Sequence, residues 1–268
     1  MKRNHNGFNG AKILLIDIET APIIAYVWQL SLHKTTIRNE QIIRDTHLLS
    51  FAAKWLGGKN MIQEDQSAAS DITDDSKLLH SIRQLLDTAD IVVVQNGVAF
   101  DIPFIQARMA AAGIPPPSPF RVVDTCTEAR KHFKFTSNKL DFLAVALKCK
   151  VKKSLHSKYP GIELWKECLA GNTRAWHEMR EYNIDDVTVL EEVYFKIRPW
   201  IERHPNVGNY INLEKPVCPK CGGNVTRRGY MFTNFGQYQR YQCAECHGWS
   251  RGRDLLNTRE SRKQQLSN

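Results

Sequence analysis

Apolar residues in this chain first gather in short runs and later recur at helical spacing, an order that predicts an α/β fold. Gly57 and Gly58 separate the second run from the third, which predicts a hairpin and an antiparallel meander of the first three strands. The fourth run is apolar throughout its centre, as in a buried parallel strand, so the sheet should be mixed. The five runs cover 12–20, 48–56, 61–66, 90–96 and 121–125.

Apolar residues spaced three and four apart predict helices between and after these strands. The predicted helices lie near 76–86, 102–109, 139–147 and 164–169, followed by one long helix over 173–201. We therefore expect four segments. They are an α/β domain at 11–202, a linker at 203–217, a small cysteine-containing module at 218–254 and a disordered polar tail at 255–268.

A formal net charge of +9 favours a polyanionic partner, most simply nucleic acid. No run approaches the ~20 apolar residues of a membrane span, so no membrane association is expected. Residues 1–10 are polar and lack the apolar segment of a secretory signal, which predicts a cytoplasmic location. The seven cysteines include two C-x-x-C pairs, and in a cytoplasmic chain such pairs indicate metal binding rather than disulfides.

Two carboxylates stand at the end of the first apolar run, where buried side chains are expected. Asp17 and Glu19 are two residues apart, so in a strand they project from the same face. Adjacent like charges at the edge of a core are costly unless a cation neutralises them. The pair therefore indicates a divalent metal site; the alternative is a strand end with two solvated acids.

Two further acids occur where the predicted sheet would gather them. Asp101 follows the parallel strand at 90–96, and Asp186 lies on the long helix four residues after Tyr182, hence on the same helical face. Four carboxylates suit two Mg²⁺ or Mn²⁺ ions about 3.5–4 Å apart, the arrangement of two-metal phosphoryl transfer. The alternative for Asp101 is a helix N-cap, and Asp185 competes with Asp186.

Three motifs in this order resemble the DEDD superfamily of 3′→5′ exonucleases, which have the RNase H-like fold. Residues 17–20 resemble its D-x-E motif, and residues 96–101 resemble its second motif, an Asn followed by an aromatic–Asp pair. Residues 182–186 are similar to Y-x-x-x-D, which marks the tyrosine-containing DEDDy branch. That branch includes the proofreading domains of family A and family B DNA polymerases, and the resemblance extends over roughly residues 11–201.

The resemblance implies an RNase H-like fold with a mixed five-stranded sheet flanked by helices, and a metal-binding role for each acid. Asp17 would bridge two ions, Mg²⁺ or Mn²⁺. Glu19 and Asp186 would complete the site that activates water. Asp101 would serve the second ion, partly through water.

The remaining motif residues are assigned to the substrate. Tyr182 would orient the attacking water and the scissile phosphate, because a tyrosine with an ordinary pKa near 10 is a poor base at neutral pH. Asn96 and Phe100 are candidate contacts to the terminal nucleotide, with a structural role as the alternative.

The implied activity is removal of 3′-terminal nucleotides from single-stranded DNA, with release of 5′-monophosphates. No polymerase sequence follows the motifs, so a stand-alone, monomeric exonuclease is expected. Three alternatives stay open: an exoribonuclease on the same fold, transposase-type strand transfer, and a catalytically inactive nucleic-acid-binding protein. The Y-x-x-x-D motif argues against strand transfer, and the intact acid set argues against an inactive protein.

The two C-x-x-C pairs define a second candidate metal site. The 21 residues between the pairs are enough for a β-hairpin. Four thiolates arranged in this way suit one tetrahedral structural Zn²⁺, with disulfides or free thiols as the alternative. The module resembles the zinc-ribbon family, and its ligands would be Cys218, Cys221, Cys243 and Cys246.

Arginines alternate with aromatic residues in this module, which favours binding of single-stranded nucleic acid. The alternative is a small aromatic core that is basic by chance. A basic loop at 148–158 is either a phosphate-contacting rim or a solvated loop. The candidate contacts are Lys152, Lys153, Arg227, Arg228 and Arg240.

Overall fold

The computed structural model describes residues 10–29, 36–151, 158–234 and 236–266. Its centre is a five-stranded sheet in the order β5-β4-β1-β6-β7. Strand β4 pairs antiparallel with β1 and β5, whereas β6 pairs parallel with β1 and β7, which confirms the predicted mixed sheet. The strands are β1 (Ile13–Thr20), β4 (Leu48–Trp55), β5 (Met61–Asp65), β6 (Ile91–Val94) and β7 (Arg121–Asp124).

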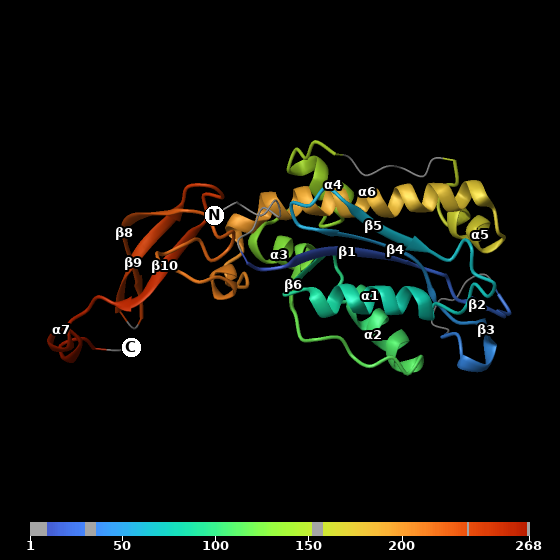
Figure 1. The fold of residues 1–268 in the computed structure, drawn as a ribbon, viewed down its shortest axis with the longest axis horizontal. Coiled ribbons are helices and arrows are strands. Elements are labelled where there is room, and N and C mark those ends of the chain that lie inside the picture. Colours follow the sequence, from blue (N-terminus) through green and yellow to red (C-terminus); the bar gives the residue numbers. More distant parts are fainter. Residues whose placement is uncertain (1–9, 30–35, 152–157, 235, 267–268) are drawn as a thin grey trace.

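Helices cover both faces of this sheet (Figure 1). One face is covered by α1 (Ser76–Thr88) and α2 (Asp101–Ala111), and the other by the long helix α6 (Thr173–Ile197). The shorter helices α3 (Thr125–His132), α4 (Leu140–Ala146) and α5 (Glu163–Leu169) pack against α6. No helix in the described part of the chain is long and apolar enough to cross a membrane.

The alternation of side chains along β1 builds two cores. Leu14, Ile16 and Ile18 pack with the residues of α1 and α2, and Ile13 and Leu15 pack beneath α6. These apolar residues are almost fully buried. The same alternation places Asp17 and Glu19 on the α6 side, in line with Ile13 and Leu15.

Strand β1 is paired on one side for its whole length and on the other for only part of it. Its register with β4 runs from Leu14 to Thr20, but its register with β6 ends at Leu15. Strand β6 ends at Val94, and the chain then turns away from the sheet. The half of β1 that carries the two acids therefore has an open edge beside the loop that follows β6.

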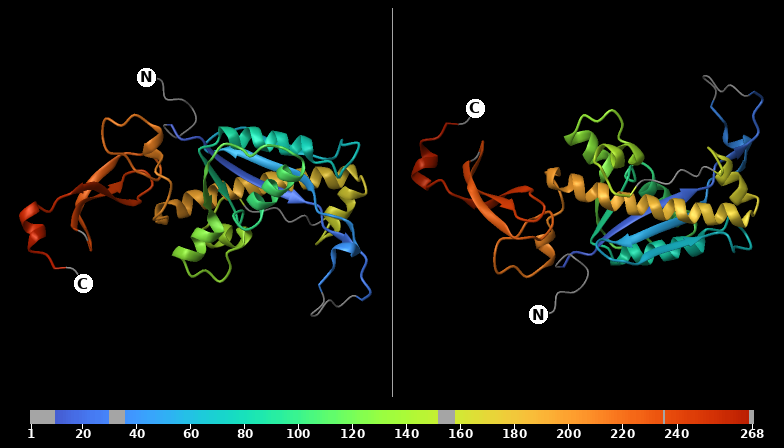
Figure 2. Two further views of the ribbon diagram at one scale, coloured as in Figure 1. Left: turned by 90° about the horizontal axis from the view of Figure 1, so that it is seen from below. Right: turned by 90° about the horizontal axis from the view of Figure 1, so that it is seen from above.

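A short arm projects from the end of the sheet, opposite the cysteine module (Figure 2). It consists of β2 (Ile24–Ala25), the 3-10 turn η1 (Asn39–Gln41) and β3 (Ile42–Arg44). Gln41 holds the arm together, because its backbone carbonyl accepts the Tyr26 N–H at 2.9 Å and its side-chain amide donates to the Tyr26 carbonyl at 2.8 Å.

The cysteine module folds around a separate antiparallel sheet in the order β10-β9-β8. Its strands are β8 (Val225–Thr233), β9 (Gly236–Cys243) and β10 (Trp249–Leu255), so the segment between the cysteine pairs forms the expected hairpin. A short helix, α7 (Arg259–Lys263), lies in the tail that we expected to be disordered. The Thr258 hydroxyl caps it by accepting the Ser261 N–H at 3.1 Å.

The segment expected to be a linker is packed between the two sheets. It contains the 3-10 turn η3 (Val207–Tyr210) and follows η2 (Arg198–Trp200). Val207 joins the core beneath α6, and its N–H donates to the Pro219 carbonyl at 2.9 Å. Lys220 is buried, and its ammonium group donates to the Pro199 carbonyl. These contacts fix the module to the end of α6.

Candidate active site

Three acidic side chains from β1 and α6 meet at the open edge of β1. Asp17, Glu19 and Asp186 each present a carboxylate oxygen within 4.8 Å of the others. Their proximity follows from the packing of α6, since Val187 and Leu190 lie on the face of β1 that also carries Asp17 and Glu19. Asp186 is buried, whereas Asp17 and Glu19 are half-buried. Asp185 is not part of this group.

An asparagine that the sequence did not single out orients Asp17. The Asn183 amide donates to the Asp17 carboxylate at 2.8 Å and to the Asp17 backbone carbonyl at 3.2 Å. The Ser50 hydroxyl in turn donates to the Asn183 carbonyl oxygen at 3.2 Å. Asn183 and Ser50 are completely buried. The one signal in the sequence is the three-residue spacing from Asn183 to Asp186, which places both on one helical face.

Asp101 lies outside the group of three acids and is not among the residues that line their cleft. Its helix α2 packs on the opposite face of the sheet, with Ile102 and Ile105 in the core shared with α1. The Asp101 carboxyl is 5% exposed. Burial raises its pKa to about 6, while hydrogen bonds from its own backbone and that of Ile18 lower the pKa. Asp101 is the first residue of α2 and not its N-cap, which is Phe100.

The loop after β6 is shaped by one buried carboxylate. Asp124 accepts the backbone N–H groups of Asn96 and Val98, both at 3.0 Å, and those of Cys126 and Thr127 at the start of α3. Asn96 adopts a positive φ of 60°. A Cβ at the next position, Gly97, would lie 2.5 Å from the Val94 Cβ. Asp124 thus holds the loop in place, and glycine at position 97 allows the loop to pack closely against Val94.

These elements enclose a cleft of about 750 Å³ that contains the acids Asp17, Glu19 and Asp186 together with Tyr182. Phe100, which is 46% exposed, lies in the cleft and stacks on Phe104 with ring centroids 5.9 Å apart. Asn96 also lines the cleft. The Tyr182 ring meets Trp165 edge-on at 6.2 Å.

Two basic side chains of the cleft were not among our predictions. Arg130 on α3 and Lys139 before α4 line the cleft and are exposed. Their positions depend on how α3 and α4 pack against α6, which a local sequence pattern does not reveal. The predicted contacts Lys152 and Lys153 lie outside the described residues.

The donor set at the acidic cluster fits a hard divalent cation. All three clustered ligand groups are carboxylates, which Mg²⁺ and Mn²⁺ prefer over sulfur or nitrogen. Three acids within 4.8 Å concentrate negative charge in one place, where a cation would relieve their repulsion.

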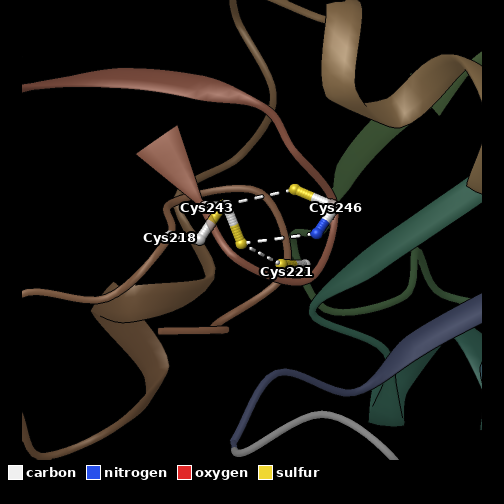
Figure 3. Close-up of side chains that lie close together, drawn as sticks. All are labelled: Cys218, Cys221, Cys243 and Cys246. Carbon is white, nitrogen blue, oxygen red and sulfur yellow. Dashed lines mark hydrogen bonds between the residues drawn. The ribbon is translucent and has the colours of Figure 1, made fainter. Parts of the chain in front are cut away.

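The four cysteines of the C-x-x-C pairs form a second cluster (Figure 3). The sulfur atoms of Cys218 and Cys246 are 3.6 Å apart, and those of Cys221 and Cys243 are 3.5 Å apart. These distances exceed the ~2.05 Å of a disulfide and approach the ~3.8 Å between ligands of a tetrahedral site with Zn–S bonds of about 2.3 Å. The N–H groups of Glu245 and Cys246 point to the Cys243 sulfur at 3.4 Å. The cluster therefore fits a zinc ribbon.

The fold and the acidic cleft define the class of protein. A family model described as the RNase_H superfamily matches residues 42–198, more than half of the chain, and the chain belongs to this superfamily. The matched region contains Asp101, Tyr182 and Asp186, whereas β1 with Asp17 and Glu19 precedes it. Membership in the RNase_H superfamily and the acidic cleft together support a nuclease function for this protein.

One similar solved structure is the family B DNA polymerase from the hyperthermophilic archaeon Pyrobaculum calidifontis. The similarity covers 71% of this chain with 18% sequence identity and a TM-score of 0.47. This chain spans 25% of the length of that polymerase. No curated protein matches the chain.

Proposed function

We propose that the protein is a metal-dependent 3′→5′ exonuclease that removes terminal nucleotides from single-stranded DNA and releases 5′-monophosphates. The observation that carries this proposal is the meeting of three carboxylates within 4.8 Å in a cleft that also contains Tyr182. The motif order Asp-x-Glu, Asp and Tyr-x-x-x-Asp supports the DEDDy type of exonuclease.

Asp17, Glu19 and Asp186 would hold the catalytic metal, and Asp101 would join them from the other side of β1. Bound there, two Mg²⁺ or Mn²⁺ ions would activate water and neutralise charge on the scissile phosphate. Asn183 keeps the Asp17 carboxylate in one orientation, so the ligand geometry exists before substrate arrives. Tyr182 would orient the phosphate from α6, supported by Trp165.

The cleft also offers groups suited to a nucleotide. The exposed Phe100 ring can stack on the terminal base, and the Asn96 side chain can donate to it. Arg130 and Lys139 are suited to contact the phosphates that follow the terminal nucleotide. The substrate strand would therefore enter between α3 and α4 with its 3′ end toward the acids.

Digestion of 5′-labelled oligonucleotides tests the proposal. Wild-type protein with Mg²⁺ or Mn²⁺ should shorten single-stranded DNA stepwise from the 3′ end. Asp17→Ala should lower the rate by at least ~10³-fold, because the clustered carboxylates no longer form a complete ligand set.

An Asp17→Ala protein that digests DNA at the wild-type rate would refute the site. Parallel digestion of RNA decides the sugar, since faster RNA digestion would make the protein an exoribonuclease. Internal cuts would instead indicate a different RNase H-like reaction.

For the cysteine module we propose one structural Zn²⁺ held by Cys218, Cys221, Cys243 and Cys246. The sulfur spacing and the N–H groups directed at Cys243 support it. The ion would add stability to a sheet that buries few apolar side chains apart from the cysteines themselves.

A further inference from the structure

The cysteine module and the tail after it together carry most of the excess positive charge of the chain. Residues 218–268 contain nine Lys and Arg but only three Asp and Glu, which gives +6 of the total of +9. The sheet β8-β9-β10 extends away from the larger domain, and most residues of β8 and β10 are exposed (Figure 1, Figure 2). A basic, solvent-facing sheet of this kind suits a polyanion.

Strand register separates the side chains of this sheet into two faces. Tyr238, Arg240 and Gln242 are two residues apart on β9 and therefore lie on one face of the sheet. Arg251 pairs with Arg240 and Trp249 pairs with Gln242, so both lie on that face as well. We call Tyr238, Arg240, Trp249 and Arg251 the arginine–aromatic face. Arg227 pairs with Tyr241 and Phe232 with Gln237, which places both on the opposite face. Arg227 and Arg240, both predicted to contact nucleic acid, thus lie on opposite faces of the sheet.

On the arginine–aromatic face, each guanidinium lies over a ring. The Arg251 guanidinium carbon is 4.1 Å from the Tyr238 ring centroid, and that of Arg240 is 4.8 Å from the Trp249 centroid. Backbone carbonyls add a second support, since Arg240 donates to Arg228 at 2.8 Å and Arg251 donates to Gly252 at 3.1 Å. Two cations are therefore held in place, and each retains further N–H donors.

We propose that the arginine–aromatic face is a binding site for single-stranded nucleic acid. Ordered guanidinium groups suit phosphates because less side-chain entropy is lost on binding. Trp249 is 48% exposed, so its ring is accessible to an unpaired base. The bases of a duplex are stacked on one another and do not offer their faces to such a ring. This site goes beyond the proposed exonuclease activity, because binding here requires no cleavage.

Binding of a fluorescent single-stranded oligonucleotide, followed by anisotropy in an Asp17→Ala background, tests the site without digestion. Arg251→Ala should weaken binding about tenfold and reduce the slope of log K against log salt by about 0.7, the value for one lost contact to a single strand. Arg227→Ala is the matched control, since it removes the same charge from the other face. It should change the affinity by less than about twofold.

A second pair of variants tests the stacking contribution. Trp249→Ala should weaken binding about tenfold, whereas Phe232→Ala, which removes an exposed ring from the opposite face, should have little effect. Unchanged zinc content and melting temperature in all four variants would show that the sheet remains folded.

Equal losses in Arg251→Ala and Arg227→Ala would overturn the proposal, because binding would then follow overall charge. Tighter binding of duplex than of single strands would also overturn it. If neither Arg251→Ala nor Trp249→Ala weakens binding, the proposal is wrong. Because the assay uses an inactive background, these outcomes are independent of whether the cleft is an exonuclease site.

Discussion

The contact between Asn183 and Asp17 shows what a single residue adds to the acidic cluster. Strand alternation alone places Asp17 and Glu19 on one face, and this was predictable from their spacing. The orientation of the Asp17 carboxylate could not be predicted, because it depends on the Asn183 amide, 166 residues away in the sequence. A long-range contact of this kind leaves no local pattern beyond the position of Asn183 near Asp186.

Asn183→Ala should reduce nuclease activity about 10- to 100-fold and raise the Mg²⁺ concentration needed for half-maximal rate, since residues that orient ligands contribute this much. The measurement is a Mg²⁺ titration of the digestion rate. Ser50→Ala, which removes only the support of the Asn183 carbonyl oxygen, should have a smaller effect in the same direction. A loss of thermal stability with an unchanged Mg²⁺ requirement would show that Asn183 is only structural.

At the scale of elements, the site depends on the separation of β1 from β6 beyond Leu15, which leaves the edge of β1 open beside Asp17 and Glu19. The order of strands and helices followed from hydrophobic periods, and so did the buried parallel character of β6. The separation of the two strands could not be predicted from the sequence. It results from the Asp124 hydrogen bonds to the loop after β6 and from the close approach of Gly97 to Val94. The sequence also did not reveal that α2 packs on the opposite face of the sheet and leaves Asp101 outside the group of three acids.

Asp124→Ala should lower the free energy of unfolding by about 3 kcal/mol, because four backbone N–H groups, one buried and three partly buried, lose their acceptor. Below the melting temperature it should raise KM for the oligonucleotide, since Asn96 and Phe100 lose their fixed loop, with little change in the Mg²⁺ requirement. Urea denaturation and steady-state kinetics measure the two effects.

Asp87→Ala provides the comparison for Asp124→Ala. Asp87 accepts one loop N–H, that of Ser118, and pairs with Arg83 on the surface of α1. Its replacement should cost less than about 1 kcal/mol. A KM effect equal to that of Asp124→Ala would contradict the role of the loop.

At the scale of the whole molecule, the unexpected feature is the junction at residues 203–217. Its polar, Pro- and Gly-containing sequence indicated a linker, but Val207, His204 and Gly208 are buried there. The His204 Nδ1–H donates to the Pro205 carbonyl at 2.7 Å, so its Nε2 accepts the Tyr194 hydroxyl at 2.7 Å. This arrangement requires neutral His204.

Burial lowers the pKa of His204 from 6.5 to about 4. A lowered histidine pKa means that stability is present above about pH 6.5 and is lost as the pH falls toward 4, because the unfolded state takes up the proton first. Between about pH 7.5 and about pH 5.5 the expected loss is about 1.4 kcal/mol. Urea denaturation of both proteins at both values, with zinc in excess, should show that wild-type protein loses this much stability relative to His204→Gln.

The packed junction also affects how long an oligonucleotide stays bound to the protein during digestion. Helix α6 carries Tyr182 and Asp186 and ends at Ile197, next to the residues that hold the cysteine module. From Asp186 to Ile197 the helix rises about 17 Å, and the buried contacts keep the module at a set separation from the cleft instead of an average over linker conformations.

A strand that occupies both the cleft and the arginine–aromatic face must bridge this separation. As the 3′ end is shortened, the strand eventually becomes too short to reach both places. The oligonucleotide then loses its second point of attachment and dissociates. The length at which digestion products are released would thus be set by the rigid connection between the two sheets.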